Sequence, residues 1–325
     1  MTFTAPSLSY QFLAPILVVL AGALVGVVVE AFAPRGKRVK VQLSIAFISL
    51  LGALGFVVAN HSKYSTGAAM SSVVIDGAAH LIQGTVLIIS LIALFLMADQ
   101  EAFTPVAAAI PGSDEEREAS SKGIVVSEIF PLTLFAVAGM LLFPVATDLI
   151  TLFVALEVLS LPLYLMSGLA RRRRLASQEA ALKYFLLGAF SSAFFLFGAA
   201  FIYGYTGSVT FAGIHEGIIG GSGNDVFLLI GISFLSIGLL FKVGAVPFHA
   251  WSPDVYQGAP TAVTAFMAAA TKVAAFGAML RIFYVSFAEA HWSWQPALSA
   301  IAIVTMLFGS LVAIAQRDVK RMLAY

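Results

Sequence analysis

Apolar segments of about twenty residues recur along the chain and alternate with short polar connections. A helix needs about twenty residues to cross a hydrocarbon core of about 30 Å, whereas a barrel strand needs about ten and alternates in polarity. The length and uniform apolarity of the segments therefore predict an all-α, polytopic transmembrane bundle. Nine spans are expected, at residues 11–32, 41–59, 78–98, 129–147, 148–169, 178–204, 225–246, 261–284 and 296–315.

The composition agrees with this class. Apolar residues make up 60% of the 325 residues and charged residues only 11%, whereas soluble domains are about one quarter charged. A net charge of +1 gives no sign of nucleic-acid binding, and the absence of cysteine excludes thiolate ligands for metals or iron–sulfur clusters in this chain. The N-terminus lacks a basic region and a cleavage site, so the first apolar segment is expected to be a retained span.

The positions of lysine and arginine predict the orientation. With nine alternating crossings, thirteen of the eighteen basic residues fall on one side of the membrane. We therefore expect the N-terminus outside and residues 316–325 in the cytoplasm. The thirteen are Arg35, Lys37, Arg38, Lys40, Arg117, Lys122, Arg171, Arg172, Arg173, Arg174, Arg317, Lys320 and Arg321. The run at 171–174 is best explained as a topology anchor that contacts anionic lipid.

The stretch 225–257 is too long for one span and contains Gly244 and Pro247 directly after Lys242. Proline removes a backbone donor and clashes with the preceding helical turn. We predict a discontinuous helix whose break lies inside the protein, where freed carbonyls can find donors. The alternative is a helix that simply ends and is followed by a cytoplasmic loop.

Four ionisable groups lie within the predicted spans: Glu157, Lys183, Lys242 and Lys272. Each charge costs about 3 kcal/mol at mid-membrane even on lenient insertion scales, so these groups are expected to face one another or water inside the bundle. Glu157 also begins a polar stripe that continues through Ser160, Tyr164 and Ser167 on one helix face.

Acid, hydroxyl and amine groups in a row can relay protons through water. Burial favours the neutral amine of lysine, whereas a nearby carboxylate favours the ammonium, so a change in that distance can switch a lysine between holding and releasing a proton. Arginine cannot do this, because its guanidinium stays protonated. The alternative is a set of static ion pairs between helices. A single mid-span acid, Glu157, cannot pair with three lysines, although Glu179 could pair with Lys183 four residues on.

Two further features are weaker. His249, just after Pro247, could extend the relay toward the cytoplasm, although alone it would be read as an interfacial histidine. The Gly-rich stretch 220–223 is expected to be a turn on the outer side, because no phosphate-binding lysine accompanies it.

The segment 242–266, KVGAVPFHAWSPDVYQGAPTAVTAF, resembles the signature of the antiporter-like subunits of respiratory complex I, the proton-pumping NADH:quinone oxidoreductase. Leu156-Glu157 and the terminal DVKRMLAY at 318–325 match as well, and EAALKYFLLGAFSS at 179–192 is most similar to the subunit N branch (chain 2 in mitochondrial naming). The resemblance covers essentially the whole chain.

This resemblance implies a fold of two inverted five-helix repeats, each with a broken helix and each forming half of a proton channel. The expected regions are 1–128, with three N-terminal helices and an acidic cytoplasmic loop; 129–287, the first repeat; and 288–325, a ninth helix and the start of an incomplete second repeat. The resemblance also implies relay roles for the acid and lysines named above and for His249. They are Glu157, Lys183, Lys242, Lys272 and His249.

The sequence departs from the family pattern in two places. Gln257 stands where the family usually has Glu, which removes one charge near the break. The chain ends at Tyr325, where family members continue through about five more helices, so we expect a fragment that holds half of a two-part channel.

The resemblance implies a proton-translocating subunit of the bacterial cytoplasmic (inner) membrane. No cofactor is expected in this chain; FMN, iron–sulfur clusters and quinone would be bound elsewhere in the complex. The expected partners are neighbouring antiporter-like and small membrane subunits, lipid and protons. Two alternatives stay open: a membrane subunit of a cation/proton antiporter or membrane-bound hydrogenase, and a purely structural membrane scaffold.

Overall fold

The computed structural model describes residues 8–99, 102–103, 112–122, 124–171, 174–221 and 224–325. Arg172, Arg173, Ser222 and Gly223, which belong to the predicted lipid anchor and the predicted turn, lie outside the described residues.

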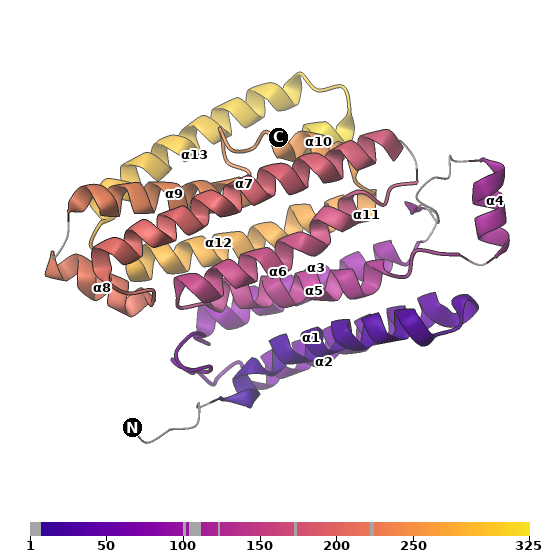
Figure 1. The fold of residues 1–325 in the computed structure, drawn as a ribbon, viewed down its shortest axis with the longest axis horizontal. Helices are drawn as coiled ribbons and strands as arrows, with labels where there is room; N and C mark the ends of the chain where they lie inside the picture. The colour runs from indigo at the N-terminus through magenta and orange to yellow at the C-terminus, as the bar shows by residue number, and fades with distance from the viewer. Residues whose placement is uncertain (1–7, 100–101, 104–111, 123, 172–173, 222–223) are drawn as a thin grey trace.

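The described residues form a bundle of long helices that run roughly along one axis (Figure 1). The first part contains α1 (Tyr10–Phe32), α2 (Arg35–Ala59), α3 (Gly77–Met97), α4 (Asp114–Ser121), α5 (Ile129–Leu142), the 3₁₀ turn η2 (Phe143–Val145) and α6 (Leu149–Ser167). The second part contains α7 (Arg174–Thr206), α8 (Phe211–Gly220), α9 (Asp225–Val243), α10 (Trp251–Gly258), α11 (Thr261–Phe266), the π-helical η3 (Met267–Thr271), α12 (Lys272–Arg281), the π-helical η4 (Ile282–Ser286), α13 (His291–Ile314) and α14 (Val319–Ala324).

Each of the nine predicted spans is helical. Among the described residues, eight helical segments are long and apolar enough to cross a membrane, counting Thr261–Ser286 as one. The ninth predicted span, 129–147, is the shorter apolar segment Ile129–Val145 formed by α5 and η2. Three short helices, α4, α8 and α14, were not predicted, because each lies in a segment that carries no long apolar run.

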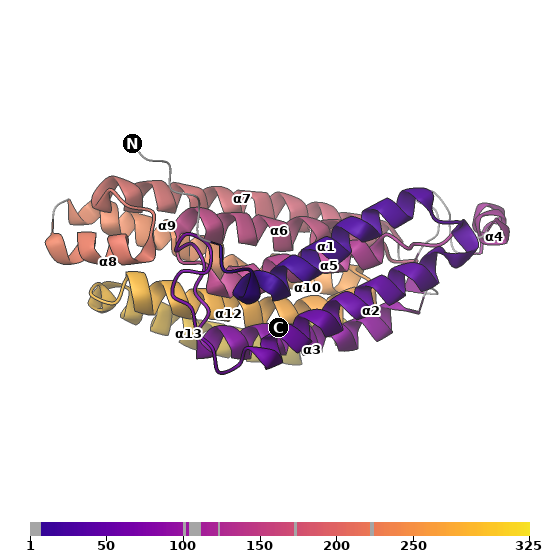
Figure 2. The same ribbon diagram turned by 90° about the horizontal axis from the view of Figure 1, so that it is seen from below.

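The short span lies at the centre of the bundle. Eleven of the fourteen residues of α5 are buried, and the helix packs against α1, α3 and α6. The α1–α2 pair forms the layer at one edge, and α13 lies at the opposite edge (Figure 1). Seen from below, α1 and α2 face the viewer (Figure 2). The position of α5 explains its length, because a helix surrounded by protein does not need to match the bilayer alone.

The discontinuous helix is confirmed, but its break is only partly enclosed, because Ala245 is buried whereas Pro247 is exposed. α9 ends at Val243, Gly244 adopts a left-handed φ of +81°, and the chain turns helical again at α10. Figure 1 shows α9 and α10 one after the other along α7. Pro247 lies in the break. Proline has no backbone N–H to donate and its ring would clash with a preceding helical turn, so it prevents the helix from continuing.

Close packing between α7 and α9 depends on small residues. A Cβ added at Gly198 of α7 would lie 2.7 Å from the carbonyl oxygen of Gly231, and one added at Gly231 would lie 3.0 Å from the backbone nitrogen of Ile202. Only glycine allows the two backbones to approach this closely. The contact fixes α9, and therefore Lys242 near its end, against α7.

The predicted basic connections gather at one end of the bundle. The α1–α2 turn, α4, the link from α6 to α7 and the link from α13 to α14 lie at the same end in Figure 1, opposite α8. At the other end α8 ends at Gly220, and Gly221 has a φ of +59°. Of the predicted turn 220–223, Gly220 is thus the last residue of α8 and Gly221 is in a turn.

Candidate functional site

The polar stripe of α6 faces the interior. Ser160 is 1% exposed and Tyr164 6% exposed, and Ser192 of α7 donates its hydroxyl to a carboxylate oxygen of Glu157. Glu157 itself is half-buried. Since Ser160 lies three residues after Glu157 on the same helix face, the acid and the hydroxyl line one strip of the bundle interior.

Lys242 reaches this strip from α9. Its side chain is 3% exposed, and Nζ donates to the hydroxyl oxygen of Ser160 at 2.6 Å. The ammonium also lies 5.6 Å from the ring centre of Tyr184. A neutral hydroxyl and an aromatic face are weak partners for a buried charge.

Lys272, the first residue of α12, contacts the end of α9. Its Nζ donates to the carbonyl oxygens of Val243 at 2.5 Å and Lys242 at 3.2 Å. It also lies 5.2 Å from the ring centre of Trp251. The π-helical η3 immediately precedes Lys272, and such local widening of a helix often accompanies a functional position.

Two stacked rings connect the surroundings of these lysines. Tyr184 of α7 and Trp251 of α10 stack with centres 4.6 Å apart and planes at 5°. Each ring receives one ammonium, Lys242 on Tyr184 and Lys272 on Trp251. A row of polar groups therefore runs from the half-buried Glu157 through the buried Ser160 and Lys242 to the half-buried Lys272, across α6, α9 and α12.

Within the described part of the chain, neither Lys242 nor Lys272 forms an ion pair with a carboxylate. Lys183 differs. Its Nζ pairs with Glu179 at 2.6 Å, as the i+4 spacing predicts, and with Asp254 at 2.8 Å. Its side chain is 41% exposed. Static pairing therefore describes Lys183 but not the buried Lys242 or the half-buried Lys272.

Asp254 of α10 also binds α14. Its second carboxylate oxygen accepts from Arg321 at 2.8 Å, so the acid is shared between α7 and α14. Arg321 donates in addition to the side-chain oxygen of Gln257 at 3.2 Å. Gln257, which replaces the Glu of the family pattern, thus keeps a polar contact without its charge.

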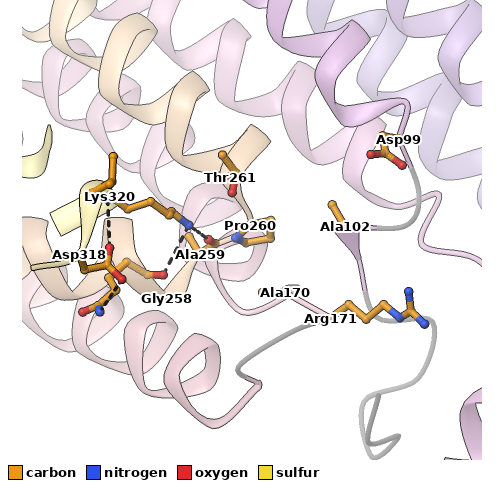
Figure 3. Close-up of a pocket in the computed structure, with 12 residues that line it drawn as sticks. Asp99, Ala102, Ala170, Arg171, Gly258, Ala259, Pro260, Thr261, Asp318 and Lys320 are labelled. Atoms are coloured by element: carbon orange, nitrogen blue, oxygen red, sulfur yellow. Dashed lines mark hydrogen bonds between the residues drawn. The ribbon is translucent and has the colours of Figure 1, made fainter. Parts of the chain in front are cut away.

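A cavity of about 560 Å³ opens next to this network (Figure 3). Lys320 donates to the carbonyl oxygens of Ala259 at 2.6 Å and Gln257 at 3.4 Å, and the Gln257 side chain donates to Asp318 at 3.2 Å. Arg171 and Lys320 supply positive charge to the lining and Asp99 and Asp318 negative charge. A polar cavity of this volume has room for many waters.

His249 lies in the break and contacts α13 and the last residue of the chain. Its ring contacts those of Phe308, with centres 5.1 Å apart, and Tyr325, with centres 5.7 Å apart. The structure therefore places four of the five predicted residues at the contacts of α6, α7, α9, α10 and α12, and His249 on the side of α13 and α14.

Three residues of the site escaped sequence reasoning. Asp254 is the sole acidic residue between Asp225 and Glu289, and this isolation beside a predicted break was a usable signal. Arg321 was counted only for topology. Ser192 is a neutral residue in an apolar helix, and nothing in its local sequence indicates that it meets Glu157.

The chain is similar in sequence to several known proteins. The family model described as NADH:quinone oxidoreductase/Mrp antiporter, TM, matches residues 146–325. The NADH-quinone oxidoreductase subunit N of a Nocardioides species is 56% identical over all of this chain and 64% of its own length. That of Mycobacterium tuberculosis is 50% identical over all of this chain and 65% of its own. The chain thus spans just under two thirds of these relatives.

Solved structures agree on the fold. A chain of respiratory complex I from Thermus thermophilus with bound aureothin has a TM-score of 0.74 and 31% identity, over 96% of this chain and 61% of its own. A chain of the Mrp complex from Dietzia has a TM-score of 0.74 at 24% identity, over 96% of this chain and 55% of its own, which supports the fold alone. With more than half of its residues matched by the family model, this chain is a multi-pass membrane protein of the NADH:quinone oxidoreductase/Mrp antiporter transmembrane family.

Proposed function

We propose that the chain is a proton-translocating part of the membrane arm of a proton-pumping NADH:quinone oxidoreductase. The observation that carries this proposal is the pair of interior lysines, Lys242 and Lys272, which have hydroxyl, carbonyl and aromatic partners and no carboxylate within ion-pair distance among the described residues. A static staple would pair each charge, because an unpaired charge is costly at membrane depth.

Proton transfer gives these groups a reason to be buried. A lysine that can lose its proton does not have to stay charged, and hydroxyls such as those of Ser160 and Ser192 can both donate and accept. Glu157 joins this row through the hydroxyl of Ser192 and through the helix face that it shares with Ser160. Protons would pass along Glu157, Lys242 and Lys272 through intervening water.

Lys183 and His249 would serve the ends of this path. Lys183, partly exposed and bound to Asp254, would act where protons enter. His249 would act beyond the break, on the side of α13. Residues 129–287 would form the first of two inverted repeats, between an N-terminal region 1–128 and the start of a second repeat at 288–325.

The redox chemistry would take place in other subunits. FMN, iron–sulfur clusters and quinone would be bound there, and this chain would contribute no redox centre. Its partners would be neighbouring antiporter-like and small membrane subunits and lipid in the bacterial cytoplasmic (inner) membrane. The basic end of the bundle would face the cytoplasm, with the N-terminus outside and residues 316–325 inside.

A cation/proton antiporter subunit is the second candidate, because the matching family model covers Mrp antiporters and the Dietzia Mrp complex has the same fold. Copurification separates the two candidates. A complex I subunit is expected to copurify with flavin and iron–sulfur subunits, whereas an antiporter subunit is not.

The test measures proton pumping per electron in vesicles that contain the assembled complex. We expect Lys242→Met and Glu157→Gln to lower the pumping rate at least tenfold while NADH oxidation by the peripheral subunits continues. Lys63→Met makes the same substitution at an exposed connection and is expected to pump normally. Normal pumping by Lys242→Met would show that the interior lysine is structural.

A further inference from the structure

The break leaves the last carbonyls of α9 without the helical donors that a continuous helix would supply. A helix end has four such acceptors, and inside a membrane each needs a partner. The backbone N–H of Gly244 donates to the carbonyl oxygens of Leu240 and Phe241, and that of Ala245 donates to Leu240. The indole of Trp251 also donates to Phe241, at 2.9 Å.

The final two carbonyls have a different donor. Those of Lys242 and Val243 accept from a single group, the Nζ of Lys272, at 3.2 and 2.5 Å. The next N–H along the chain, that of Val246, is directed elsewhere and donates to the Thr305 hydroxyl of α13 at 3.0 Å. Among the described residues, the ammonium of Lys272 is therefore the donor that completes the end of α9.

We propose that Lys272 is the C-terminal cap of the broken helix and that, through this cap, it positions Lys242. The inference rests on the proposed function and adds a second role to a residue of the proton path. A cation at a helix C-terminus meets the negative end of the helix dipole, and hydrogen bonds from a charged donor are about twice as strong as neutral ones. The cap is therefore strongest while Lys272 holds its proton.

The local sequence makes room for this cap. A Cβ added at Gly244 would lie 3.0 Å from the Lys272 Nζ, so a side chain there would push the ammonium away. The same glycine has the left-handed φ of +81° that ends α9, a conformation that glycine adopts without strain. The rings of Trp251 and Tyr256, 5.2 and 6.0 Å from Nζ, form the remaining wall.

This arrangement couples the protonation state of Lys272 to the position of Lys242. The carbonyl that Lys272 binds at 3.2 Å belongs to Lys242 itself. When Lys272 gives up its proton, the cap weakens and the last turn of α9, which carries the Lys242 ammonium, is held less firmly against Ser160. Lys272 thus acts on Lys242 through the backbone as well as through space.

The test follows backbone hydrogen exchange at the end of α9 in the assembled complex, using a peptide that contains Gly244 and Ala245. Lys272→Met removes the donor, and we expect exchange in this peptide to rise about tenfold. Lys272→Arg keeps a permanently charged donor, and exchange should stay within about threefold of the unmodified complex. A peptide from α1 serves as the control for global unfolding.

Exchange and pumping separate the two proposals. Unchanged exchange in Lys272→Met, or an equal rise in the Met and Arg variants with α1 unaffected, would overturn the cap. Loss of pumping in Lys272→Arg with exchange preserved supports both the cap and the relay, because a guanidinium caps but does not release a proton. Pumping that persists in Lys272→Arg with exchange preserved would retain the cap and reject Lys272 as a relay residue.

Discussion

Arg281 of α12 binds the carboxylate of Asp76 with both terminal guanidinium nitrogens, each at 3.0 Å. Arg281 is 9% exposed and also donates to the Pro144 carbonyl at 2.6 Å, while Asp76 accepts from the Ala79 N–H and caps α3. This one pair joins α3, α12 and the central span at the end of the bundle opposite the basic connections.

Loss of the Asp76 charge should destabilise the bundle. Asp76→Ser keeps a capping oxygen for α3 but leaves Arg281 without its carboxylate. We expect the free energy of unfolding to fall by about 1–3 kcal/mol, a loss that the partial exposure of Asp76 keeps moderate. Asp76→Ala should lower the free energy of unfolding by about 1 kcal/mol beyond the Ser variant, because the N-cap of α3 is lost as well. Thermal unfolding in detergent measures both, and equal stability of the Ser variant and the unmodified protein would show that the pair contributes nothing.

The glycine contact between α7 and α9 predicts a sharp difference between two glycines of the same helix. Gly198→Ala would force α7 and α9 apart and should destabilise by about 1–3 kcal/mol. Gly204→Ala, where nothing lies within 4 Å of the new Cβ, should be neutral or slightly stabilising. Thermal unfolding of the two variants compares them, and similar effects at both positions would contradict the contact.

The ion pair between Glu116 of α4 and Arg171, in the link that follows α6, should be lost in acid. The Arg171 guanidinium and the Gly112 N–H lower the pKa of Glu116 from 4.5 to about 2. Because the folded value lies below the unfolded one, the contact stabilises the fold above about pH 4.5 and is lost as the pH falls from there to about 2. Hydrogen exchange of residues 112–122, corrected for intrinsic pH dependence, should rise over this window.

Glu116→Gln is the control for this titration. It removes the ionisable group, so exchange of the same segment should already be raised at pH 7 and should not change further with acid. An identical acid response in the variant would assign the effect to another group.

Asp254 and Arg321 should hold α14 on α10. Arg321→Gln leaves one oxygen of Asp254 without its partner, and we expect exchange in residues 318–325 to rise several-fold. Arg317→Gln changes an exposed arginine just before α14 and should leave exchange unaltered. If both variants behave alike, α14 is held by contacts other than the ion pair.

Sequence reasoning was strongest where one local property decides the outcome. Membrane depth requires about twenty apolar residues, so the spans were predictable, and Gly244 with Pro247 was sufficient to predict the break. The span at 129–147 shows the limit of this rule. Hydropathy gives an apolar length but not the neighbours, and it could not indicate that α5 would be enclosed by other helices.

The site was predictable as a set of residues but not as a set of contacts. Hydropathy identified Lys242 and Lys272 because a charge in an apolar run is conspicuous. The contact of Lys272 with the Lys242 carbonyl depends on how α12 packs against a helix thirty residues away, and no local pattern encodes that. Lys183 was grouped with the buried lysines for the same reason, since its partner Asp254 lies 71 residues further on.

The contact of Gly198 with Gly231 also limits how the bundle can move. At these two glycines the backbones of α7 and α9 meet without side chains between them, so the helices cannot be pressed closer together there, and separating them would break the contact. Sliding parallel to their axes is the displacement that keeps the two surfaces in contact. Any travel of Lys242 relative to α7 would then be directed toward one membrane face or the other, and not across the bundle.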